Sequence, residues 1–203
     1  MAKLDLKKEL RQLYLPSATA VSLVDVPELW FAMIDGSGDP NGSPAFEAAV
    51  GALYAVSFTA KFLVKAEQAR DYVVMPLEGL WWMEDMAQFS LDRKDEWLWT
   101  LMILQPDYVT PEVFEQALGQ ARRKRDNPAL AEVRFEAFHE GLSAQIMHLG
   151  PYSEEGPTVA RLHAFIAEQG YRPHGKHHEI YLGDPRRCAP DKLKTVLRQP
   201  VTR

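Results

Sequence analysis

The sequence predicts an α+β fold in which a strand-helix-strand-strand unit occurs twice. Each half of the chain carries an amphipathic helical segment followed by two strand-like runs. Residues 98–106 (LWTLMILQP) also resemble residues 193–200 (LKTVLRQP), with one residue inserted in the first copy. This duplication predicts pseudo-two-fold symmetry, with an antiparallel sheet and a helix on one face in each half. A ligand cleft is expected where the halves meet.

The first half is expected to span about residues 17–127, after a short helix over residues 4–14. Ser43 followed by Pro44 is typical of a helix start, because a serine side chain caps free backbone N–H groups and proline suits the first helical position. This helix is expected to end near Gln68. The other elements expected in this half are strands at residues 21–26, 30–34, 71–78 and 96–104, and a helix at residues 110–126.

The second half is expected to span about residues 128–203, so that residues 1–203 form a single domain. A helix is expected over residues 154–169, with Gly170 as its C-terminal stop because glycine readily adopts the left-handed conformation found there. The strands expected in this half lie at residues 134–138, 141–149, 175–182 and 193–197.

Composition narrows the class of protein. The 203 residues are 46% hydrophobic, which is enough to build a core. The net charge of −5 disfavours nucleic-acid binding by broad charge attraction. Cys188 is the only cysteine, so no intramolecular disulfide is possible and a reducing compartment is expected. No run approaches the roughly 20 apolar residues of a membrane span. These features predict a cytoplasmic protein without a membrane or nucleic-acid partner.

One predicted strand carries an unusual polar face. Alternation along residues 177–182 places His177, Glu179 and Tyr181 on one side and aliphatic residues on the other. A buried carboxylate in the middle of a strand needs a partner, a proton or a ligand. Glu179 is therefore the candidate catalytic residue, with His177 and Tyr181 as candidate substrate contacts. The alternative is a solvent-facing strand in which Glu179 pairs with Lys176 or an arginine.

Aromatic residues concentrate in the middle of the chain, where four of the five tryptophans fall between residues 81 and 99. Core packing explains any one of them, but indole faces also stack on planar ligands. Trp82 and Trp99 are the candidates for such contacts. Tyr72 and Tyr152 are candidates, like Tyr181, for hydrogen bonding to a substrate carbonyl. Buried tyrosines bonded to backbone are the alternative.

Two further groups leave alternatives open or point away from a site. Glu78 is either a second carboxylate of the site or a cap for a turn at Gly79. His174, His177 and His178 invite a metal interpretation, but their spacing matches no strong ligand set and no cysteine supports it. We therefore expect no metal and no other cofactor.

Three runs carry a family resemblance: residues 72–82 (YVVMPLEGLWW), 145–157 (QIMHLGPYSEEGP) and 177–187 (HHEIYLGDPRR). Together they resemble the stand-alone GyrI-like small-molecule-binding proteins, over nearly the whole chain. The resemblance implies a ligand pocket between two repeats and, by analogy with drug-sensing relatives, a glutamate at the position of Glu179 that meets cationic aromatic drugs. Some stand-alone members are similar to hydrolases that open the strained cyclopropane of DNA-alkylating natural products.

These observations lead to three functional hypotheses. In the first, the protein binds a flat hydrophobic xenobiotic and hydrolyses it as a cyclopropanoid hydrolase, with Glu179 activating water. In the second, it binds and sequesters such drugs without chemistry. In the third, it inhibits gyrase through a protein interface. A small hydrophobic aromatic ligand is the expected partner, and the sequence identifies no protein partner.

Overall fold

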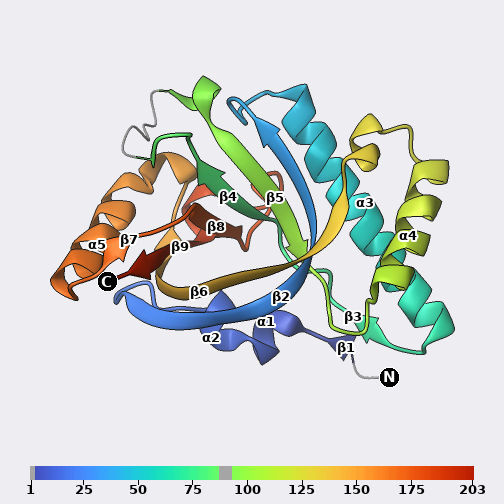
Figure 1. Ribbon diagram of the computed structural model, residues 1–203, viewed down its shortest axis with the longest axis horizontal. Helices are drawn as coiled ribbons and strands as arrows, with labels where there is room; N and C mark the ends of the chain where they lie inside the picture. Colours follow the sequence, from blue (N-terminus) through green and yellow to red (C-terminus); the bar gives the residue numbers. More distant parts are fainter. Residues whose placement is uncertain (1–2, 87–92) are drawn as a thin grey trace. The chain divides into compact units, whose positions relative to one another are not determined.

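The computed structural model describes residues 3–86 and 93–203 (Figure 1). The chain divides into two compact units, each built from segments that are distant in sequence. Unit 1 comprises residues 1–6, 29–77 and 81–138, and unit 2 comprises residues 7–28, 78–80 and 139–203. Strands β2 (Ser22–Ser37), β4 (Glu78–Trp82) and β6 (Arg134–Leu149) contribute residues to both units.

The order of elements confirms the predicted α+β class and its repeated unit. Apart from the two-residue strands β3 and β7, the order strand-helix-strand-strand occurs first as β2, α3, β4 and β5, and again as β6, α5, β8 and β9. The remaining bounds are β1 Lys3–Leu4, α1 Leu6–Glu9, α2 Arg11–Tyr14, α3 Pro44–Glu67, β3 Asp71–Tyr72, β5 Leu98–Leu104, α4 Pro111–Lys124, α5 Gly156–Glu168, β7 Arg172–Pro173, β8 His177–Tyr181 and β9 Lys194–Thr202.

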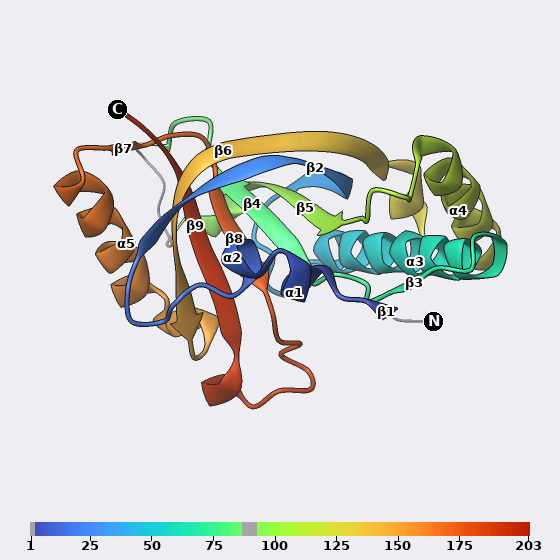
Figure 2. The same cartoon turned by 90° about the horizontal axis from the view of Figure 1, so that it is seen from below.

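In unit 1, β2 pairs antiparallel with β5, and α3 and α4 lie side by side (Figures 1 and 2). The α3 helix begins as predicted, because the Ser43 side chain accepts a hydrogen bond from the backbone N–H of Phe46 at 3.3 Å. One face of this helix is buried through Ala49, Leu53, Val56 and Ala60.

Trp99 on β5 packs directly across Gly36 on β2. The two residues lie opposite each other in the strand register. A Cβ atom built on Gly36 would stand 2.0 Å from the indole ring of Trp99, so the ring occupies the space that any side chain would need. Glycine in a strand often marks such a close approach. The position of the Trp99 ring therefore depends on Gly36.

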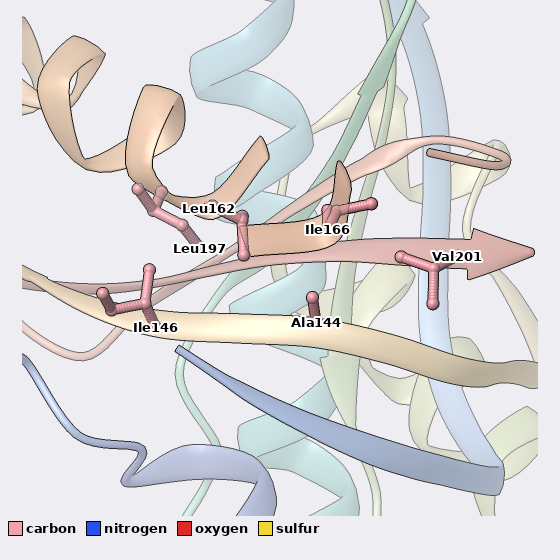
Figure 3. Close-up of a cluster of buried hydrophobic side chains, with 6 residues drawn as sticks. All are labelled: Ala144, Ile146, Leu162, Ile166, Leu197 and Val201. Atoms are coloured by element: carbon pink, nitrogen blue, oxygen red, sulfur yellow. The ribbon is translucent and has the colours of Figure 1, made fainter. Parts of the chain in front are cut away.

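In unit 2, β9 lies between β6 and β8 and is antiparallel to both. Helix α5 covers one face of these strands through Leu162 and Ile166, which are fully buried. Figure 3 shows both side chains beside residues of β6 and β9. The cluster comprises Ala144, Ile146, Leu162, Ile166, Leu197 and Val201.

The opposite face of these strands carries a row of buried polar side chains. His178 on β8 lies opposite Arg198 on β9, which lies opposite Gln145 on β6. Arg198 donates to Oε1 of Gln145 and to Oε2 of Glu140, both at 3.0 Å. The side chains of Arg198 and Glu140 are only 3% and 1% exposed. The guanidinium is therefore paired inside the protein, where an unpaired charge is strongly destabilising.

His178 connects this row to a second carboxylate. Its Nδ1 lies 2.9 Å from Oε1 of Glu140, and its Nε2 lies 3.0 Å from Oε2 of Glu78. Tyr14 donates to the other oxygen of Glu78 at 2.7 Å. Because both ring nitrogens face carboxylates, the imidazole must carry two protons to satisfy them. Burial lowers the pKa of His178, but the charge of Glu140 and its hydrogen bonds raise it above the ordinary value. We call Tyr14, Glu78, Glu140, His178 and Arg198 the buried charge network.

The network also ties the N-terminal helices to the sheet. Arg198 donates to the backbone oxygen of Leu13 at 2.6 Å, and the Gln145 side chain donates to the backbone oxygen of Gln12 at 2.6 Å. Helix α2 accordingly lies close to β8 and β9 (Figure 2). The segment predicted as one helix is divided at Leu10 into α1 and α2.

Several predicted strand boundaries are wrong. The strand expected at residues 71–78 is two separate strands, β3 and β4, with Pro76 among the residues between them that lie outside either strand. The pairs of strands expected at residues 21–34 and at residues 134–149 are each one long strand. Gly141, the first residue of the strand expected at 141–149, lies within β6 with a φ of +73°.

Helix α3 is also long and apolar enough to cross a membrane by composition, with a mean hydropathy of 1.3 over its most apolar window. Half of that window is buried inside the structure, as in the core helices of soluble proteins. Helix length and composition alone are weak support for a membrane span.

We expect Glu140→Gln to be severely destabilising, by about 3–5 kcal/mol near neutral pH, because it leaves His178 and Arg198 with one carboxylate between them. Burial raises the pKa of Glu140, but the charges of His178 and Arg198 lower it to about 2, below the ordinary 4.5. The advantage of the wild type should therefore be complete above pH 4.5 and be lost as the pH falls toward 2. Urea unfolding of both proteins between pH 2 and pH 7 measures this difference in the free energy of unfolding.

The matched control is Glu136→Gln on the same strand. Glu136 is 56% exposed and pairs with Arg134, so its loss should change the free energy of unfolding by less than about 1 kcal/mol. Equal effects of the two substitutions would contradict the role given to the buried charge network.

We expect Gly36→Ala to lower the free energy of unfolding by about 1–3 kcal/mol, because the added methyl group displaces the Trp99 ring. Tryptophan fluorescence should change with it. Gly51→Ala in α3 is the control: its Cβ would meet Asn127 at an ordinary 3.4 Å, and it should stabilise by about 0.5–1 kcal/mol. A Gly36→Ala protein that unfolds like the wild type would show that the ring does not need this space.

Candidate functional site

The Glu179 carboxylate lies in a polar cluster on the α5 side of unit 2. The Tyr181 hydroxyl donates to its Oε2 at 2.8 Å, and Nε2 of His177 lies 3.4 Å from its Oε1. The Glu179 side chain is 19% exposed, so the carboxylate is sheltered but still reachable. The predicted alternation of β8 is confirmed, because these three side chains meet on one face while His178 joins the buried charge network on the other.

Strand register extends this face across β9 and β6. Thr195 lies opposite Tyr181, and His148 lies opposite Thr195. The ring of Tyr152, which is 38% exposed, meets the Tyr181 ring edge-on at 5.5 Å between centroids. Predicted contacts His177, Tyr152 and Tyr181 are therefore brought together with the predicted base.

A second carboxylate, Glu155, lies beside Glu179. Glu155 immediately precedes α5 and is only 8% exposed, and its Oε1 has no hydrogen-bond partner. Burial, followed by the negative charge of Glu179, raises the pKa of Glu155 to about 8. The nearby Thr195 hydroxyl acts in the opposite direction and lowers that pKa, although it makes no hydrogen bond of ordinary geometry. Burial and the neighbouring carboxylate thus favour the protonated form of Glu155.

The backbone before α5 is firmly held, which fixes the position of Glu155. Nδ1 of His148 lies 3.0 Å from the Thr158 hydroxyl, and its Nε2 lies 3.2 Å from the backbone oxygen of Pro151. Gly150 donates its N–H to the backbone oxygen of Leu193 at 3.0 Å, and adopts a φ of +127°. This loop therefore joins β6 to α5 in a defined path.

The pair of carboxyl groups has the properties of an acid and a base. Glu155 is buried with a raised pKa, while Glu179 is hydrogen-bonded to a phenol and near an imidazole. Neighbouring carboxyls whose environments separate their pKa values commonly divide these roles. The arrangement can therefore accept a proton at one oxygen and donate a proton at another.

Glu78 lies outside this cluster, because it is 1% exposed and bonded to Tyr14 and His178 in the buried charge network. The alternative that it caps a turn at Gly79 is wrong, since Gly79 lies within β4.

The other predicted contacts belong to unit 1. Tyr72 is 1% exposed and its hydroxyl donates to the backbone oxygen of Ser57 at 3.4 Å, which matches the alternative of a buried structural tyrosine. Trp82 is half-buried at the end of β4. Trp99 is 2% exposed, and its Nε1 has no hydrogen-bond partner.

Trp99 is part of an aromatic cluster within unit 1. The Phe46 ring meets Trp99 edge-on at 5.3 Å between centroids and stacks on Trp81 at 6.2 Å. Trp81 meets Trp97 edge-on at 5.5 Å. Packing accounts for these rings, as it does for most buried aromatic residues. The unpartnered indole N–H of Trp99 is the polar group in this cluster that a ligand oxygen would satisfy.

Within residues 3–86 and 93–203, no group of three or more histidine, cysteine or acidic side chains has the arrangement of a metal site. His178 is engaged by two carboxylates and His177 lies near Glu179.

Sequence reasoning overlooked Glu155 and Thr195. Glu155 stands in a Glu-Glu-Gly-Pro run before a helix, a pattern that usually marks an exposed acidic helix start. The signal that distinguishes Glu155 from Glu154 is burial, which depends on the fold.

The model of the GyrI-like small molecule binding domain matches residues 19–202. Three solved structures from Listeria innocua are similar over their full length. An uncharacterized conserved protein is 45% identical, with a TM-score of 0.91 and coverage of 98% of this chain and 100% of its own. Two proteins described as hydrolases are 43% and 42% identical, with TM-scores of 0.87 and 0.85; they cover 99% and 98% of this chain and 100% of their own. No match was found among the curated proteins.

We expect Glu155→Gln to change how stability depends on pH. The pKa of Glu155 is raised to about 8 from 4.5, so its contribution to wild-type stability is complete below pH 4.5 and is lost as the pH rises through about 8. Glutamine imitates the protonated form at every pH. The melting temperature of the variant should therefore exceed that of the wild type by an amount that grows across this range. For the exposed residue, the melting temperature of Glu154→Gln should instead run parallel to that of the wild type across the pH range. A Glu155→Gln melting curve that also runs parallel would refute the raised pKa of Glu155.

Proposed function

The chain belongs to the GyrI-like small-molecule-binding family, and from this premise we propose that it binds a flat, hydrophobic, electrophilic compound and hydrolyses it. The observation that carries the proposal is the Glu179 carboxylate held by Tyr181 beside the buried Glu155, whose Oε1 has no hydrogen-bond partner. Two full-length structural relatives described as hydrolases support the reaction class. The family resemblance suggests the substrate class: a natural product whose strained cyclopropane is conjugated to a carbonyl group.

In the proposed mechanism Glu179 removes a proton from a water molecule, and the water oxygen attacks the cyclopropane CH₂ carbon. The strained C–C bond breaks, and its electron pair moves through the conjugated ring to the carbonyl oxygen. Tyr181 fixes the orientation of Glu179, since it donates to Oε2 from the same strand face. The aromatic ring of Tyr152 at the exposed side of the cluster offers a surface for a planar substrate.

Sequestration without chemistry is the second candidate. It is favoured by the aromatic cluster of Phe46, Trp81, Trp97 and Trp99. The indole N–H of Trp99 has no hydrogen-bond partner and would suit a ligand oxygen. A binder of this kind would retain its compound unchanged, whereas a hydrolase would release a hydrated product.

We expect the purified protein to convert a cyclopropane-bearing alkylator of the duocarmycin type to a product heavier by one water, with many turnovers per protein. Glu179→Gln should lower the turnover rate by about 10²–10⁴-fold, because it removes the general base. Mass spectrometry of the small molecule over time measures both.

Glu154→Gln is the control, because Glu154 is an exposed carboxylate directly before Glu155 in the chain. Full turnover by a folded Glu179→Gln protein would exclude this mechanism. A compound recovered unchanged but bound in stoichiometric amount would replace hydrolysis with sequestration.

A further inference from the structure

We propose that Glu155 is the general acid of this reaction, donating a proton to the substrate oxygen while Glu179 takes one from water. The inference rests on the proposed function and adds a second catalytic residue to it. It also narrows the substrate class to neutral electrophiles in which negative charge develops on an oxygen as the strained bond breaks.

The position of Glu155 supports this role. The residue is 8% exposed and its Oε1 is without a hydrogen-bond partner, although buried carboxyl oxygens are normally paired. Thr195, on the same side of the sheet, also has an unpartnered hydroxyl. Thr195 lies opposite Tyr181 in the register, and Tyr181 donates to Glu179. Two unsatisfied polar groups thus adjoin the proposed base, where a substrate oxygen would satisfy them.

The charge of the surroundings explains why Glu155 retains its proton. Glu179 from β8 faces it as a carboxylate, and burial adds to the cost of a second negative charge. His148 on β6 bonds to Thr158 and to Pro151 and so helps to hold the loop without pairing with Glu155. Other titratable groups on the same face of the sheet as Glu179 are His177 and Tyr181 on β8 and Tyr152 in the loop before α5. His163 on α5 lies near His177.

The proton balance of the reaction closes with these two residues. Water supplies a hydroxyl group to the cyclopropane carbon and a proton to Glu179. The broken C–C bond supplies an electron pair to the carbonyl oxygen, which takes the proton of Glu155. Transfer of the proton from Glu179 to Glu155 then restores the starting state. The net change is addition of one water, and no oxidant, reductant or cofactor is required.

The acid role is tested by the pH dependence of turnover. With the cyclopropane-bearing alkylator as substrate, wild-type kcat should fall as the pH rises through about 8, where Glu155 loses its proton. Glu155→Gln should reduce kcat by at least about tenfold and remove this alkaline decline, because glutamine cannot donate a proton. KM should change little, since glutamine keeps the shape of the protonated side chain. Glu154→Gln should reproduce the wild-type profile.

A second readout does not depend on turnover. Carbon-13 NMR of glutamate side chains in the free protein should show one carboxyl that titrates near pH 8 and is absent from Glu155→Gln. If Glu155→Gln keeps both the wild-type kcat and the alkaline decline while Glu179→Gln is inactive, the proposed hydrolase stands and the acid role is overturned. If the wild type shows no turnover, both proposals fail.

Discussion

The pairing of buried charges around His178 is the interaction on which unit 2 depends. Taking an ion out of water costs several kcal/mol even after the protein relaxes, so such groups persist only when each has a partner. Here Glu78 and Glu140 oppose His178 and Arg198, and the four formal charges cancel. The network joins β6, β8 and β9 to the N-terminal helices. Hydrophobic packing by α5 supports the other face of the same strands.

Strand β8 couples this network to the candidate site. Its side chains alternate, so His178 points into the charge network while Glu179 points into the cluster that contains Tyr181. The same residue type then behaves in opposite ways on the two faces. Glu140, next to two cations, has a pKa of about 2, whereas Glu155, next to another carboxylate, has a pKa of about 8. Burial raises the pKa of both carboxyls, and the neighbouring charges then oppose that effect at Glu140 and add to it at Glu155.

The sequence predicted those features that depend on local chemistry. The Ser43 cap and the alternating face of β8 follow from near neighbours along the chain, and the structure confirms them. Long strands were divided in the prediction, since residues 134–138 and 141–149 were treated as separate strands, whereas Gly141 continues β6 with a φ of +73°. Glu155 was overlooked because its burial arises from contacts with β8 and β9, which are distant in sequence. The partner of Glu78, a histidine one hundred residues away, was beyond local reasoning for the same reason.

The raised pKa of Glu155 beside Glu179 also bears on the choice between hydrolysis and simple capture of cations. A site that only neutralises a cation is best served by a carboxylate free to take full charge, and a second carboxyl that resists ionisation adds little attraction. A reaction that moves an electron pair onto oxygen needs the opposite arrangement, with a base at one end and a proton donor at the other. Glu179, held by Tyr181, and Glu155, which keeps its proton at neutral pH, match the second requirement. The buried Glu155, with an unpartnered Oε1 beside Glu179, therefore fits the proposed acid–base chemistry on a neutral substrate.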